Sequence, residues 1–106
     1  MFKLIEISGD TIRLDDVGTS SMVTAACSRS GLRVEGAAVA DDKITLICSE
    51  NTTAESFSYR FTALSTFSED ELYPVLRSRY DNNFRTVSAF RLADGFWTLT
   101  EKSDLQ

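Results

Sequence analysis

Hydrophobic and polar residues alternate most regularly over residues 57–63 (FSYRFTA), where every second position is aromatic or alanine. A repeat of two residues is typical of a strand with one buried face. Residues 33–40 and 43–49 flank Asp41-Asp42 and predict a hairpin. The second of these two strands is almost entirely hydrophobic, so we expect much of both its faces to be covered.

Short turns join two further pairs of predicted strands. Residues 2–7 and 11–15 flank a Ser-Gly-Asp turn, which predicts a hairpin at the start of the sequence. Later in the chain, residues 85–92 and 96–101 flank Asp94-Gly95, a dipeptide that favours the tight turns of hairpins. Strands joined by such short turns pair antiparallel.

Helical spacing of apolar residues predicts a first helix between Thr19 and Ser30. Gly31 follows at a position where helices commonly end. The serines and threonines of this segment weaken its intrinsic helix propensity. The prediction therefore depends on the hydrophobic spacing.

The second predicted helix has a stronger start signal. Ser68-Glu69-Asp70-Glu71 matches a capping box, in which Ser68 accepts a hydrogen bond from the amide of residue 71 and Glu71 reaches back. Pro74 leaves two alternatives open: the helix begins at Ser68 and is kinked by the proline, or it begins at Pro74, a favoured first position. Four apolar residues form the stripe that we expect to face inward: Leu72, Val75, Leu76 and Tyr80.

The second half of the chain repeats a pattern of the first. A shift of 53 residues aligns residues 34–47 with residues 87–100 without a gap, and five of the 14 positions are identical. The helical stripes align at the same shift, so each half has the order strand, helix, hairpin. We therefore expect an internal β-α-β-β duplication, with pseudo-repeats over about 1–50 and about 56–102.

These elements together predict an α+β fold. A chain of 106 residues has the length of one domain, so residues 1–106 are expected to share one core. We expect a two-layer sandwich, in which a mainly antiparallel sheet of six to seven strands carries both helices on one face.

Composition limits the partners and the location of the protein. Sixteen acidic and eleven basic residues give a net charge of −5, which repels nucleic acid and suits a basic protein partner. The sequence shows neither the apolar core of a signal peptide nor an apolar run long enough to cross a membrane. We therefore expect a cytoplasmic protein without a membrane or nucleic-acid partner, in which Cys27 and Cys48 are reduced and buried.

Residues suited to catalysis are scarce. The chain has no histidine, which removes the commonest general base and the commonest metal ligand. Turn and cap chemistry explains the adjacent carboxylates Asp15-Asp16 and Asp41-Asp42, and no nucleotide-binding or nucleophile motif occurs. The sequence favours a non-enzymatic protein, and we assign no catalytic residue, metal or cofactor.

Aromatic residues point to a surface for a protein partner. Where the first half has alanine, lysine and isoleucine, the second half has Phe90, Arg91, Phe96 and Trp97. Neighbouring residues of a strand point to opposite faces, so either Phe96 or Trp97 is expected on the outer face. Aromatic and arginine side chains on an open face have the composition of a binding hot spot. We expect a protein-binding module (an adaptor, inhibitor or immunity-type protein) that docks through these residues. The alternative is a homodimer, in which a second copy of the chain covers this face.

A cleft between the two halves is the alternative site. Tyr59, Arg60 and Tyr73 would supply polar contacts to an anionic ligand in such a cleft. The protein would then be a small-ligand-binding or regulatory domain.

Overall fold

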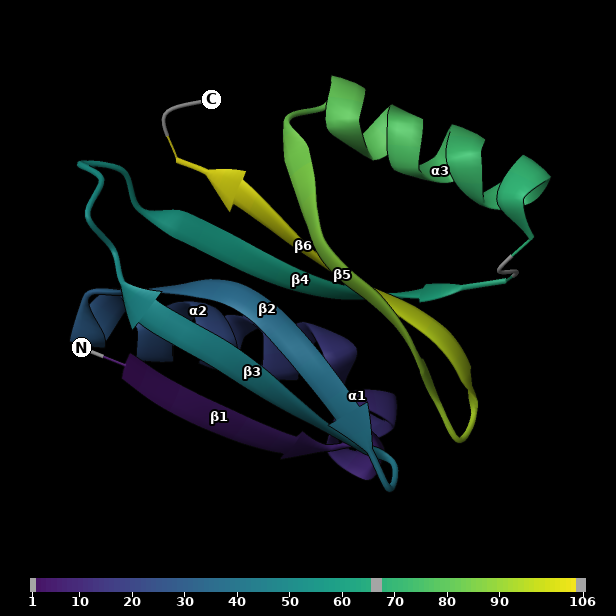
Figure 1. Cartoon of the computed structure of the whole chain (residues 1–106), viewed down its shortest axis with the longest axis horizontal. Helices are drawn as coiled ribbons and strands as arrows, with labels where there is room; N and C mark the ends of the chain where they lie inside the picture. The colour runs from purple at the N-terminus through teal and green to yellow at the C-terminus, as the bar shows by residue number, and fades with distance from the viewer. Residues whose placement is uncertain (1, 66–67, 105–106) are drawn as a thin grey trace.

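Two three-stranded antiparallel sheets and three helices make up the α+β structure, a computed structural model that describes residues 2–65 and 68–104 (Figure 1). The strands are β1 (Phe2–Ser8), β2 (Leu32–Ala40), β3 (Lys43–Glu50), β4 (Phe57–Leu64), β5 (Phe84–Leu92) and β6 (Gly95–Ser103). The helices are α1 (Gly9–Leu14), α2 (Asp16–Ser30) and α3 (Glu69–Asp81).

The strands are divided between two sheets, with the orders β1-β3-β2 and β4-β6-β5. The expected single sheet of six to seven strands is therefore wrong for the described residues. β2 and β5 lie near each other where the sheets meet, but they do not pair. Each of these two strands contains a bulge, at Glu35 in β2 and at Val87 in β5. A bulge disrupts the even spacing of backbone groups that a ladder between the two strands would require.

Both sheets and α2 share one hydrophobic core. Phe61 and Phe90 meet edge to face in the second sheet, with ring centroids 6.4 Å apart. Full burial of a side chain of this kind contributes about 1.5–3 kcal/mol. The buried core residues are Ile7, Ile12, Val23, Cys27, Leu32, Val34, Ile44, Leu46, Cys48, Tyr59, Phe61, Phe90, Leu92, Trp97 and Leu99.

The predicted C-terminal end of α2 and the predicted turn between β2 and β3 are confirmed by the backbone, whereas α2 begins at Asp16 and not at Thr19. Gly31 closes α2 with a φ of 64°, the left-handed geometry of a helix C-cap. Asp41 and Asp42 have φ values of 53° and 57°, as a tight hairpin turn of type I′ requires. The turn between β5 and β6 instead falls at Ala93-Asp94, one residue before the predicted dipeptide.

The first predicted hairpin is wrong, because residues 9–14 form helix α1 and not a strand over 11–15. The Ser8 side chain caps this helix by accepting a hydrogen bond from the Thr11 amide at 3.2 Å. Ile12 is fully buried, whereas Leu14 is 88% exposed. Alternation over so few residues cannot distinguish a strand from a single turn of helix.

Helix α3 runs from Glu69 to Asp81 with Pro74 inside it, so the longer of the two alternatives holds. The capping box does not form, because the Ser68 side chain makes no capping hydrogen bond. The predicted apolar stripe of the helix is only partly covered, because Leu72 and Leu76 are half-buried. Val75 and Tyr80 are 38% and 71% exposed, and no residue of α3 is fully buried.

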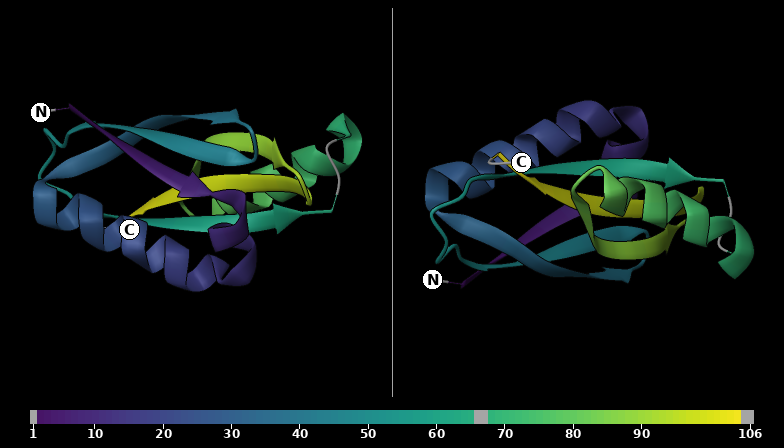
Figure 2. Two further views of the ribbon diagram at one scale, coloured as in Figure 1. Left: turned by 90° about the horizontal axis from the view of Figure 1, so that it is seen from below. Right: turned by 90° about the horizontal axis from the view of Figure 1, so that it is seen from above.

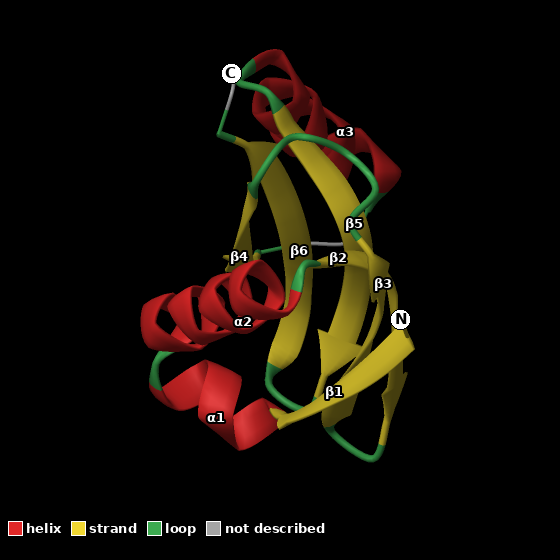
Figure 3. Ribbon diagram, turned by 90° about the vertical axis from the view of Figure 1, so that its left-hand side faces the viewer, coloured by secondary structure: helices red, strands yellow, loops and turns green. Residues whose placement is uncertain are grey.

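The helices do not share one face, contrary to the sequence prediction (Figure 2; Figure 3). Helix α2 packs along β4 and contributes Val23 and Cys27 to the core. Helix α3 lies on the other side of the second sheet, where Arg79 donates a hydrogen bond to Thr98. Thr98 follows the inward-facing Trp97, so its side chain points away from the core. Within the described residues, no helix is long and apolar enough to span a membrane.

Candidate functional site

The predicted aromatic patch is divided between the core and the surface. Phe90 and Trp97 lie opposite each other in the sheet and point into the core, with 7% and 6% exposure. The Trp97 indole donates to the Asp94 carboxylate at 3.2 Å. Arg91 and Phe96 face the other way, and the Arg91 guanidinium carbon lies 5.8 Å from the centre of the Phe96 ring. Of the four residues, Arg91 is exposed and Phe96 is half-buried.

The three residues of the predicted cleft do not come together. Tyr59 is buried, and Tyr73 is 62% exposed on α3. Arg60 is exposed on β4. Tyr59 and Arg60 line a common pocket, but Tyr73 lines a different one.

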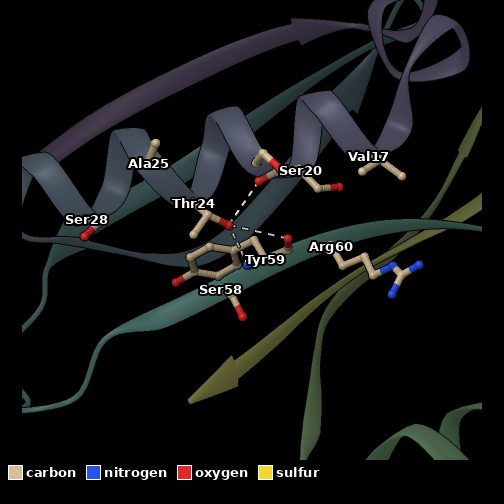
Figure 4. Close-up of a pocket in the computed structure, with 9 residues that line it drawn as sticks. Val17, Ser20, Thr24, Ala25, Ser28, Ser58, Tyr59 and Arg60 are labelled. Atoms are coloured by element: carbon tan, nitrogen blue, oxygen red, sulfur yellow. Dashed lines mark hydrogen bonds between the residues drawn. The ribbon is translucent and has the colours of Figure 1, made fainter. Parts of the chain in front are cut away.

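The shared pocket is open and lies between α2 and β4, with a volume of about 550 Å³ (Figure 4). It brings together a helix of the first half and a strand of the second half. Its walls carry mainly small side chains and hydroxyl groups, with one cationic group. The lining residues are Val17, Ser20, Ser21, Thr24, Ala25, Ser28, Ser58, Tyr59 and Arg60.

Two hydroxyl groups of α2 cover the open edge of β4. Ser20 Oγ accepts a hydrogen bond from the Phe61 amide, and Thr24 Oγ1 accepts one from the Tyr59 amide, both at 2.9 Å. β4 is an edge strand, and its free amides would otherwise require water or another strand. The hydroxyl residues that weaken helix propensity thus protect a sheet edge. The sequence offered only the unusual serine and threonine content of a helix as a signal of this role.

Strand β1 forms the other outer edge and has no such cover in the described part of the chain (Figure 1; Figure 3). Its only hydrogen-bonded strand there is β3. Phe2 and Leu4 project from its outer face with 66% and 55% exposure, and Leu4 lies opposite the half-buried Ile47. An apolar strand with an open edge is a template for pairing with another chain.

A buried carboxylate ties the two sheets together. Glu101 on β6 is only 2% exposed, and it accepts hydrogen bonds from Arg33 at 2.8 and 3.1 Å, from Arg85 at 3.1 Å and from Tyr59 at 2.7 Å. Tyr59 in turn accepts the Val34 amide at 2.9 Å. Burial alone would raise the pKa of Glu101, but the hydrogen bonds from Arg33, Tyr59 and Arg85 hold this pKa below its usual value. The donors come from β2, β4 and β5, so the network links β2 to the second sheet.

A second ionic cluster joins α1 to both hairpin turns. Arg13 lies 2.6 Å from Asp42 and 3.2 Å from Asp94. Asp42 also accepts the Ala93 amide at 2.8 Å. The hydrogen bond from Arg13, with that from Ala93, lowers the pKa of Asp42 to about 2. This predicted turn carboxylate therefore has a structural role.

The two cysteines are free and buried, as the sequence predicted. Burial raises the pKa of the Cys27 thiol to about 12, and the neighbouring Cys48 adds to this effect. A thiol in such an environment is a poor nucleophile. In residues 2–65 and 68–104, no group of three acidic or cysteine side chains is arranged to hold a metal ion.

Comparison with known proteins leaves the function to be inferred from this chain's own surfaces. No protein-family model matches the sequence, and no curated protein or solved structure matches it significantly. Three features remain as candidate sites: the open edge of β1, the pocket between α2 and β4, and the pair of Arg91 and Phe96 on the outer face of the second sheet.

Proposed function

We propose that this protein is a non-enzymatic module that binds another protein by pairing the open edge of β1 with an extended segment of that partner. The contrast between the two outer edges carries this proposal. Ser20 and Thr24 cover the edge of β4, whereas β1 keeps an open edge beside Phe2 and Leu4. Strand addition of this kind gives affinity through main-chain hydrogen bonds and specificity through alternate side chains.

The side chains of β1 define the chemistry of the partner segment. Phe2 and Leu4 lie on the outer face of β1, so they favour apolar residues of the partner segment beside them on that face. Lys3 lies on the other face of β1, because its opposite residue on β3 is the buried Cys48. Its positive charge favours an acidic residue of the partner segment on that face. Beyond this local pairing, the net charge of −5 favours approach of a basic protein.

Arg91 and Phe96 form a second contact surface in this proposal. They lie opposite each other on the outer face of β5 and β6. An arginine over an aromatic ring at the surface has the composition of a binding hot spot. Phe90 and Trp97 stabilise the core and make no direct contact with the partner.

A matched pair of leucine variants tests the docking edge. Leu4 and Leu14 are both exposed, but only Leu4 lies on β1. Immobilised wild-type protein and the Leu14→Ser variant should capture the same partner, and chemical cross-links should map to β1. Leu4→Ser should lose most of this capture while keeping the wild-type circular dichroism spectrum. Equal capture by folded Leu4→Ser, or cross-links confined to other elements, would reject the β1 edge.

We also propose that the chain arose by duplication of a β-α-β-β unit. Both sheets have the same relative strand order. Residues matched by the 53-residue shift face the same way: Ile44 and Trp97 point inward, and Ala38 and Arg91 are exposed. Sequences of relatives provide the test, because a duplication predicts relatives whose two halves are more alike than those of this chain.

The remaining features of the proposal concern organisation and location. A shared core supports one domain over residues 1–106. Two adjacent thiols that remain free support a reducing compartment such as the cytoplasm. Limited proteolysis tests the first point, since early cleavage into two stable fragments would contradict it. Imaging of a fluorescent fusion tests the second.

A small-ligand-binding function is the second candidate, favoured by the pocket of about 550 Å³ between α2 and β4. This volume is within the range of small-molecule sites. Arg60 supplies a cationic group and the serines supply hydroxyl groups. Thermal-shift screening against metabolites tests this function: a stabilising compound should lose its effect in Ser21→Leu, which fills the pocket. Stabilisation unchanged by this substitution would place the compound elsewhere.

A further inference from the structure

One arginine of the described chain is partly buried without a carboxylate partner. Arg13, Arg33, Arg77 and Arg85 each pair with an acidic side chain. Within the described residues, the other four arginines form no ion pair, and three of these are exposed at the surface: Arg29, Arg60 and Arg91. The fourth is Arg79, which is half-buried under α3. A partly buried guanidinium ordinarily requires an anion or several acceptors.

The strand register brings Arg60 close to Arg79 on the outer face of the second sheet. Arg79 donates a hydrogen bond to the hydroxyl group of Thr98 on β6, and Thr98 lies opposite Thr62 on β4. Arg60 precedes Thr62 by two residues, so both project from the same face. Arg60 therefore lies diagonally across from Thr98, at the distance that long side chains bridge readily.

The side chains of β6 beneath these two arginines are polar, and their hydroxyl groups already form hydrogen bonds. Thr98 and Thr100 are 0% and 2% exposed. Their hydroxyl groups donate to the backbone carbonyls of Thr62 and Arg60, each at 3.4 Å. Neither threonine can supply a counter-charge, and no ion pair in residues 2–65 and 68–104 balances the positive charges of the two arginines.

Charge and geometry both favour an anion with several oxygens. Burial, and then the charge of Arg60, lowers the pKa of Arg79. A guanidinium carries five N–H donors, and Arg79 uses one of them on Thr98. Two forks of donors suit a phosphate group, whose charge of about −2 at neutral pH would balance both cations.

We propose that Arg60 and Arg79 form a binding site for the phosphate group of a small phosphate monoester. Arg60 also lines the pocket between α2 and β4, so the rest of the monoester would lie in that pocket. The inference deepens the ligand-binding function proposed above by naming the class of ligand, and it is independent of partner docking at β1.

Titration followed by NMR tests the site directly. Inorganic phosphate added to the whole protein at low ionic strength and pH 7.5 should shift the Nε–Hε signals of Arg60 and Arg79 saturably. Arg60→Gln and Arg79→Gln should each weaken phosphate binding roughly tenfold or more, as expected for the loss of hydrogen bonds to a charged group. Lys43→Gln, which removes an exposed cation on β3 of the first sheet, should leave it unchanged.

Several outcomes would overturn the proposal. Phosphate binding equal to wild type in Arg60→Gln would exclude the site. Because Arg60 is exposed, this variant should fold even if Arg79→Gln does not, and the test then remains valid. Acetate binding as tight as phosphate binding would exclude the phosphate class. Phenyl phosphate should bind more tightly than inorganic phosphate, and Ser21→Leu should remove only that gain. A gain that survives Ser21→Leu would refute occupancy of the pocket while leaving the phosphate contacts intact.

Discussion

Glu101→Gln removes the negative charge shared by Arg33, Arg85 and Tyr59 while it keeps the size of the side chain. The substitution acts where β2 of the first sheet meets the second sheet. Glutamine can still accept a hydrogen bond through its carbonyl oxygen, but its amide group is a donor and faces other donors. The variant therefore isolates the contribution of the charge to the association of the two sheets.

The structure sets the size of the expected effect. A hydrogen bond to a charged group contributes about 1.5–3 kcal/mol. The side chains of Arg33 and Arg85 are 32% and 52% exposed, so water replaces part of what they lose. The contribution of each arginine contact should therefore be smaller, closer to the value of about 0.2–1 kcal/mol for a surface ion pair. With the buried Tyr59 contact, we expect a loss of roughly 2–4 kcal/mol, near the range for breaking a buried ion pair.

Urea denaturation at pH 7 measures this loss as a lower midpoint with an unchanged m-value. Glu50→Gln is the matched control, because Glu50 is exposed on β3 and forms no ion pair in the described residues. The control should change the free energy of unfolding by less than about 0.5 kcal/mol. Equal stability of Glu101→Gln and Glu50→Gln would show that the buried charge does not hold the sheets together.

Three further predictions concern other parts of the fold. The pKa of Asp42 falls from 3.8 to about 2 on folding, so the contribution of its charge to stability is present above pH 4 and lost toward pH 2. Asp42→Asn should flatten acid unfolding curves in this window, and an unchanged curve would contradict the Arg13 contact. Gly9→Ala places a Cβ 2.5 Å from the Asp42 carboxylate and should cost about 1–3 kcal/mol in thermal unfolding, whereas Gly36→Ala meets nothing within 4 Å and should cost less. Cys27 and Cys48 should resist iodoacetamide in the native protein and react after denaturation; rapid native alkylation would show that the thiols are accessible.

Local signals in the sequence predicted the elements whose conformation is determined locally. The Asp41-Asp42 turn, the helix end at Gly31 and the alternating strand over 57–63 all depend on neighbouring residues. Helix α1 was missed because the five alternating residues 11–15 fit either element. The Ser68 cap was wrong because a matching pattern does not ensure that the side chain adopts the capping geometry.

Long-range contacts determined what the sequence could not predict. Alternation required Phe96 and Trp97 to face opposite ways, but only the placement of the core determines that Trp97 is inside. Glu101 occupies an inward position two residues after the core residue Leu99, yet its three donors come from distant segments. The role of Ser20 as cover for β4 depends on Phe61, which lies 41 residues further along the chain.

Residue-resolved amide hydrogen exchange of the free protein tests most directly whether β1 is the open edge and β4 the covered one. The account predicts slow exchange at Tyr59 and Phe61, faster exchange at Phe61 in Ser20→Ala, and fast exchange at every second amide of β1. Uniformly slow exchange along β1 at low protein concentration, or fast exchange at Tyr59 and Phe61, would contradict it.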